Sequence, residues 1–75
     1  MDENLATYMA LPYRMVLWFE DGEWSAVVPD LPGCVAGGLT KYEVLEAIED
    51  AKVAWISSAL LEGAPVPEPS ALLVA

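Results

Sequence analysis

Residues 28–38 read VPDLPGCVAGG, and this stretch decides how the chain turns. It holds two prolines and three glycines between a strand-like segment and the start of a helix. Proline fixes the backbone angle φ and removes a hydrogen-bond donor, whereas glycine permits positive φ. The stretch therefore predicts a loop with one defined backbone path, in which Pro29, Pro32, Gly33 and Cys34 have structural roles.

The segment before this loop has the pattern of a β-hairpin. Residues 13–20 are rich in strand formers, Asp21-Gly22 is a strong two-residue turn signal, and residues 23–28 form the return strand. Strand periodicity divides the first strand into two faces, and neither of them is properly polar. We therefore expect both faces of the sheet to be covered, one by a helix and the other by a partner.

The segment after the loop has the pattern of one long helix. Thr40 is a good N-cap, and Glu43 three residues later completes a capping box. Apolar residues recur at spacings of three and four over residues 41–62, and Gly63 with Pro65 ends the pattern. The stripe expected to face the core contains Leu45, Ile48, Ala51 or Lys52, Trp55 and Ala59.

Composition limits the size of the interior and the kind of partner. A chain of 75 residues forms a single domain, and such a domain buries only about 60% of the surface of its unfolded chain. Because 56% of the residues are hydrophobic, some apolar side chains should face a partner or a second copy. The net charge of −9 disfavours direct binding of nucleic acid; either a basic partner or simple solubility explains it.

The residue inventory also argues against catalysis. Histidine is absent, and Cys34 has no neighbouring His or Lys in the sequence that would lower its pKa. The carboxylates do not converge on one point, as a pair of metal ions would require. We therefore expect no catalytic residue, no cofactor and no metal. A single cysteine, an acidic first segment and the lack of a membrane-length apolar run predict a cytoplasmic protein.

The ordered motifs resemble those of the HicB-like antitoxin family. The Val-Pro-Asp-Leu-Pro-Gly-Cys turn, the helix start at Thr40 and Glu43, and the Gly-Ala-Pro-Val-Pro-Glu-Pro-Ser segment occur in the order typical of that family. The resemblance covers residues 13–70 and corresponds to a stand-alone N-terminal HicB domain without a DNA-binding extension. Residues 1–12 then form a short helix or a loose arm, and residues 71–75 form an apolar tail that could pair with a sheet edge.

This resemblance implies a fold and a function. The fold is α+β and partially RNase H-like: a small antiparallel sheet of three to four strands, with residues 35–38 as a short strand and one long helix packed on one face. The function is that of a non-enzymatic antitoxin, which neutralises a small basic HicA-type toxin, an mRNA interferase, and which assembles into a dimer or tetramer. The alternatives are an orphan homo-oligomeric interaction protein and, more remotely, a relic RNase H-like nuclease.

The residues predicted to contact a partner combine one apolar anchor with carboxylates. Trp18 shares a strand face with Arg14 and Glu20, so core and interface positions are equally open for it. For Asp30, an Asx-type turn formed by its own side chain is favoured over a partner contact. The predicted partner-binding set is Trp18, Glu20, Asp21, Glu23, Asp30, Glu46, Glu49 and Asp50.

Overall fold

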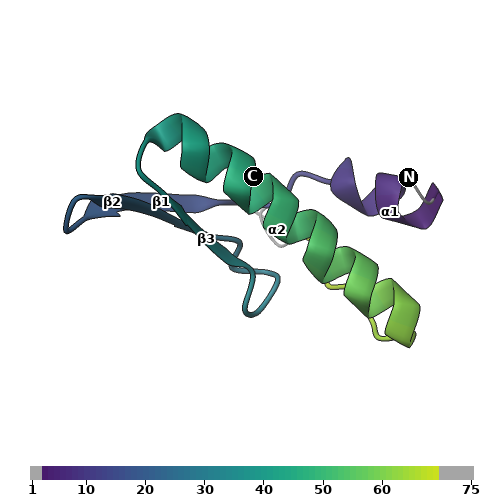
Figure 1. The fold of residues 1–75 in the computed structure, drawn as a ribbon. Coiled ribbons are helices and arrows are strands. Elements are labelled where there is room, and N and C mark those ends of the chain that lie inside the picture. Colours follow the sequence, from purple (N-terminus) through teal and green to yellow (C-terminus); the bar gives the residue numbers. More distant parts are fainter. Residues whose placement is uncertain (1–2, 70–75) are drawn as a thin grey trace.

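The computed structural model describes residues 3–69, in which a three-stranded antiparallel sheet packs against one long helix (Figure 1). In chain order the elements are α1 (Glu3–Met9), β1 (Val16–Glu20), β2 (Glu23–Val27), β3 (Val35–Gly38) and α2 (Lys41–Glu62). This architecture confirms the predicted α+β class and the short third strand, and the N-terminal segment is a short helix. The predicted tail lies outside the described residues. Neither described helix is long and apolar enough to cross a membrane.

A tight turn at Asp21 and Gly22 joins β1 to β2. Both residues have positive φ, 52° and 80°, as a two-residue type I′ hairpin turn requires. The register pairs Val16 with Val27, the last residue of β2. The strand β1 is therefore shorter than the predicted strand from Tyr13, because β2 offers no partner to the residues before Val16.

The loop between β2 and β3 consists of two consecutive tight turns. The Leu31 N–H donates to the Val28 carbonyl at 3.0 Å, and the Cys34 N–H donates to the Leu31 carbonyl at 2.9 Å. The Val28 N–H closes the base of the loop by donating to the Cys34 carbonyl at 3.1 Å. Each turn has a proline at its second position, and Gly33, with φ of 85°, follows Pro32 as a type II turn requires. The loop therefore has a single backbone path.

The hydrophobic core lies between α2 and one face of the sheet. Val44, Ile48 and Ile56 of α2 are fully buried, and Leu31 of the loop is buried with them. The helix α1 packs on the C-terminal half of α2, where Leu5 joins the same cluster (Figure 1). The core is therefore built by one side of α2, one face of the sheet, the loop and α1.

The buried side of α2 differs in part from the predicted stripe. Leu45 is exposed and Trp55 is only half-buried, so the prediction was wrong for Leu45 and incomplete for Trp55. Apolar residues occur almost all around this helix, and their spacing alone does not define one stripe. The buried residues of α2 are Val44, Ile48, Lys52, Ile56 and Ala59.

Both ends of α2 are capped as predicted. The Thr40 side chain accepts a hydrogen bond from the Glu43 N–H at 3.0 Å. The Glu43 carboxylate in turn accepts from the N–H groups of Thr40 at 3.1 Å and Leu39 at 2.9 Å. Gly63, with φ of 70°, adopts the left-handed conformation that ends the helix. The capping box and the glycine stop are confirmed.

Gly38 sets the closest approach of β3 to α2, and its substitution gives a test of the packing. A Cβ at Gly38 would lie 2.8 Å from the backbone nitrogen of Val44, so Gly38→Ala must push the strand and helix apart. We expect the free energy of unfolding to fall by about 1–3 kcal/mol, measured by urea denaturation at fixed protein concentration. In the matched control Gly37→Ala, the new Cβ meets only the Trp24 carbonyl oxygen at 3.5 Å. Equal losses in the two variants would contradict this explanation.

Candidate functional site

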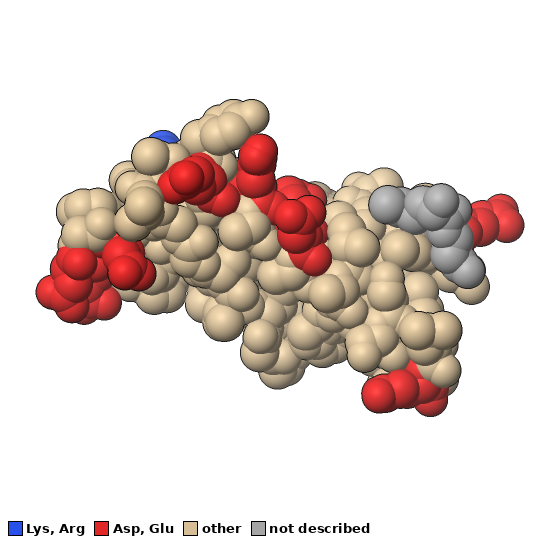
Figure 2. Space-filling model, in the orientation of Figure 1, with Lys and Arg blue, Asp and Glu red and all other residues tan. Residues whose placement is uncertain are grey.

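An acidic surface covers the N-terminal half of α2, where Figure 2 shows carboxylates gathered. Glu46, Glu49 and Asp50 are exposed there, and with Tyr42 and Leu45 they line an open hollow of about 530 Å³. Glu46 and Asp50 are four residues apart, a spacing at which like charges destabilise a helix. A bound cationic group would relieve this repulsion. We call these five residues the α2 acidic surface.

A second acidic group lies at the turn between β1 and β2. Glu20, Asp21 and Glu23 are all exposed. Glu20 and Glu23 are directly opposite each other in the strand register, where like charges are destabilising. Figure 2 shows acidic atoms at this end of the sheet and over α2 in a single view. Six of the eight predicted partner-binding residues thus belong to two exposed acidic groups.

Trp18 lies apart from the α2 acidic surface. Val16, Trp18 and Val35 are 48%, 39% and 60% exposed, and none of them belongs to the core cluster or packs against it. The residues that alternate with them along the strands pack in the core instead: Ala26 belongs to the core cluster, and its cross-strand partner Leu17 packs against that cluster. Trp18 therefore lies on the face of the sheet opposite α2, and no described element covers it. Its role at an interface stays a prediction, and one flat partner surface cannot contact both Trp18 and α2.

Asp30 lies in the first turn of the loop, apart from the other predicted carboxylates. It is half-buried and close enough to Tyr13 to affect its titration. Burial raises the pKa of Tyr13, and the neighbouring Tyr8, Asp30 and Glu68 raise this pKa further. The Tyr13 hydroxyl donates a hydrogen bond to the Pro67 carbonyl. This bond joins the segment after α2 to the segment that precedes β1. Asp30 therefore borders a structural contact, and its role in partner binding stays a prediction.

A buried lysine lies beneath the loop, at a position that the predicted stripe gave as an alternative to Ala51. Lys52 is only 3% exposed; its Nζ lies 3.3 Å from Glu49 Oε1 and 5.9 Å from the centre of the Tyr13 ring. Burial raises the pKa of the Cys34 thiol, Lys52 lowers it and Glu49 raises it, with a net upward shift. The expectation that no lysine lies near Cys34 was wrong, but the thiol is still a poor nucleophile. The sequence signal for the burial of Lys52 was its position within the apolar stripe of the helix.

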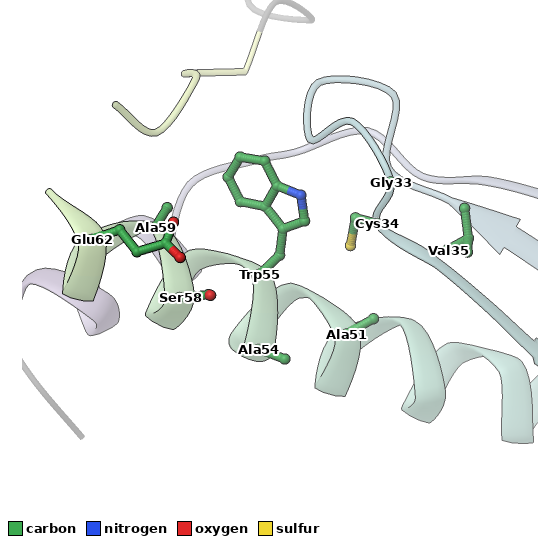
Figure 3. Close-up of a pocket in the computed structure, with 9 residues that line it drawn as sticks. All are labelled: Gly33, Cys34, Val35, Ala51, Ala54, Trp55, Ser58, Ala59 and Glu62. Atoms are coloured by element: carbon green, nitrogen blue, oxygen red, sulfur yellow. The ribbon is translucent and has the colours of Figure 1, made fainter. Parts of the chain in front are cut away.

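Cys34 also borders a hollow of about 490 Å³ between the loop and α2 (Figure 3). Small side chains of α2 form its floor, and the Trp55 indole stands between Cys34 and Glu62, which lie toward opposite ends. The Trp55 Nε1–H donates to the Pro32 carbonyl at 2.7 Å, which fixes the ring against the loop. Within residues 3–69, no three His, Cys, Asp or Glu side chains are grouped closely enough to hold a metal ion. The described lining of the hollow therefore holds no cluster of metal-ligating side chains.

These features define a small acidic α+β domain whose exposed surfaces suit contacts with other macromolecules. A protein-family model described as the HicB_like antitoxin of bacterial toxin-antitoxin system matches residues 13–74. The chain belongs to the HicB-like antitoxin family, whose members are generally not enzymes, and the resemblance of its motifs is confirmed. No curated protein and no solved structure matches the chain significantly.

The buried thiol predicts a loss of stability at alkaline pH. The pKa of Cys34 is raised above its ordinary value of 9.0, so the folded protein holds this proton more tightly than the unfolded chain does. Its contribution to stability is complete below pH 9.0 and is lost progressively above it. The pKa of Tyr13 is raised above 10.0, so ionisation of Tyr13 also lowers the stability, at higher pH. We expect urea midpoints to decrease above pH 9.0.

The control for this titration is Cys34→Ala, which removes the thiol and leaves Tyr13 in place. Its urea midpoint should stay level over the range in which the wild-type midpoint first decreases, and should decrease only where Tyr13 begins to ionise. A wild-type midpoint that stays constant above pH 9.0, or an unchanged first decrease in Cys34→Ala, would show that burial of the thiol is not responsible.

Proposed function

We propose that this protein is an antitoxin that neutralises a small basic HicA-type toxin, an mRNA interferase, by direct protein contact. Membership of the HicB-like antitoxin family supports the class of function. The observation that carries the specific proposal is the α2 acidic surface, where Glu46, Glu49 and Asp50 surround exposed apolar side chains. A ribonuclease that binds RNA must present cationic groups to phosphates, and carboxylates can occupy the same positions.

The overall charge distribution favours attraction to a cationic surface. The chain has a net charge of −9 and only three basic residues. One of these, Lys52, is buried and paired with Glu49, so its charge is directed inward. Attraction between this acidic protein and a basic toxin would accelerate their association. The effect weakens as salt shortens the screening length, which is about 8 Å at physiological ionic strength.

The α2 acidic surface offers apolar contact area as well as charge. Tyr42 is 72% exposed and Leu45 39% exposed beside the three carboxylates. Binding surfaces commonly place aromatic and apolar anchors within a polar rim, and the anchors contribute most of the affinity. Tyr42 and Leu45 were not among the predicted contacts. We propose the turn carboxylates Glu20, Asp21 and Glu23 as a second contact area and Asp30 as a peripheral one.

The α2 acidic surface can be tested by reversing one charge. Asp50→Lys places a cation where the toxin's own cations would bind, so we expect the affinity for a HicA-type toxin encoded beside this protein to fall about tenfold or more. Isothermal titration calorimetry measures this effect. Glu62→Lys is the matched control, because it makes the same charge change near the other end of α2, outside the α2 acidic surface.

The control separates local contact from overall charge. If Asp50→Lys and Glu62→Lys weaken binding equally, only net charge matters and the α2 acidic surface is not the contact. If the wild-type protein does not bind such a toxin at low salt, the toxin-neutralising function is excluded. The protein would then be an orphan interaction protein of the HicB-like family, the alternative considered from its sequence.

A further inference from the structure

We propose that the free edge of β3, together with the hollow beside it, binds an extended basic segment of a partner protein. The segment adds a strand to the sheet and places one lysine or arginine side chain beside Trp55 and Glu62. The hollow lies between the loop and α2 (Figure 3) and shares no residue with the α2 acidic surface. This inference therefore does not rest on the proposed toxin contact.

One edge of β3 pairs with no other described strand. The strand order is β1-β2-β3, so β3 is bonded to β2 on one side only. The hydrogen bond from the Val28 N–H to the Cys34 carbonyl fixes the ladder, because hydrogen-bonded pairs alternate in an antiparallel sheet. Ala36 therefore bonds to β2. The N–H and carbonyl groups of Val35 and Gly37 point away from β2, toward the free edge.

The sequence of β3 does not protect this edge against pairing. Natural sheets usually block a free edge with charged residues, a proline or a bulge. The strand β3 reads Val-Ala-Gly-Gly, and both Val35 and Gly37 are exposed. An extended peptide can therefore pair with these backbone groups. Many peptide-binding domains use such strand addition, in which the backbone bonds supply affinity and adjacent pockets for alternate side chains supply specificity.

The part of α2 beside this edge is made of small side chains. Ala51, Ala54 and Ser58 follow each other at spacings of three and four, which places them on one side of the helix. With Val35 they line the hollow of about 490 Å³, and binding pockets commonly enclose about 300–1,000 Å³. Alternate side chains of a strand paired with β3 point toward α2. The small floor leaves space for them.

Charge in the hollow selects a basic segment. Glu62 is the only charged residue in the described lining, and Figure 3 shows its side chain extending toward the Trp55 indole. The bond from the Trp55 Nε1–H to the Pro32 carbonyl keeps the ring in one orientation. A lysine or arginine placed here is attracted by both the carboxylate and the aromatic ring. The net charge of −9 attracts a basic segment and repels an acidic one.

NMR of the full chain with the synthetic peptide acetyl-Thr-Val-Thr-Arg-Thr-Val-Thr-amide tests the proposal. The peptide sequence is the same in both directions, so it can pair with β3 in either orientation, with valine and arginine on one face. We expect the amide hydrogens of Val35 and Gly37 to exchange slowly with solvent only when the peptide is bound, because they then gain acceptors. The Ala36 amide, which bonds to β2, is the internal control and should exchange slowly throughout.

Two variants test the edge and the hollow separately. Val35→Pro removes an outward N–H but no bond to β2, and proline is tolerated at such edge positions. Ala54→Arg fills the hollow with a large side chain from an exposed position of α2. Each should weaken peptide binding about tenfold or more. The control Ala6→Arg makes the same change at an exposed position of α1 outside the hollow, and should leave binding unchanged.

A second peptide tests the preference for a basic residue. The same peptide with glutamate in place of arginine should bind the wild-type protein about tenfold more weakly. Glu62→Gln removes the carboxylate of the hollow and should reduce this preference about threefold or more. The control Glu3→Gln makes the same change in α1 and should keep the preference. Circular dichroism would confirm that each variant is folded.

Several outcomes would overturn the proposal. They are no binding of the arginine peptide at millimolar concentration, unchanged binding by Ala54→Arg, or equal binding of the two peptides. Slow exchange of Val35 and Gly37 without peptide would show that the chain itself occupies the edge: a second copy if the protection depends on protein concentration, and a segment of the same chain if it does not. Asp50→Lys distinguishes this proposal from the previous one. It should keep peptide binding, and its loss would contradict a separate site.

Discussion

The hydrogen bond from the Val28 N–H to the Cys34 carbonyl closes the loop on which the other contacts depend. By joining the two ends of the double turn, it brings β3 back beside β2 so that Val27 pairs with Val35. The same loop buries Leu31 in the core and presents the Pro32 carbonyl to the Trp55 indole. Sheet register, core closure and helix position therefore follow from one short stretch, in which two prolines and one left-handed glycine leave few alternative paths.

One long helix can cover only one face of a three-stranded sheet. The core uses one side of α2, and the short helix α1 packs on α2. The chain nevertheless places valines and a tryptophan on the far face and acids on the outer side of α2. The result is two exposed surfaces of different chemistry, one apolar and one acidic, separated by the thickness of the sheet and the helix.

Local signals predicted most of the fold, and contacts between distant residues account for what was missed. The Asp21-Gly22 turn, the Thr40–Glu43 capping box and the Gly63 stop each depend on neighbouring residues, and all were predicted correctly. The environment of Lys52 depends on Tyr13 and Cys34, which are close to it only after folding. The acids of α2 and of the hairpin turn were identifiable from sequence. Their exposed apolar neighbours Tyr42 and Leu45 were not, because apolar residues occur almost all around α2 and their spacing does not show which side faces outward.

The position of Trp18 depends on which face of the sheet α2 covers. Alternation groups Trp18 with Arg14 and Glu20, but it does not say on which side the helix packs. Gly38 allows the observed packing, because it pairs with Trp24 and lets the backbone of α2 approach β3 where a side chain would collide with Val44. The helix therefore packs on the Trp24 side, where that indole also contacts the Phe19 ring at 5.5 Å between centroids. Trp18 lies on the other side, where no element of the described residues covers it.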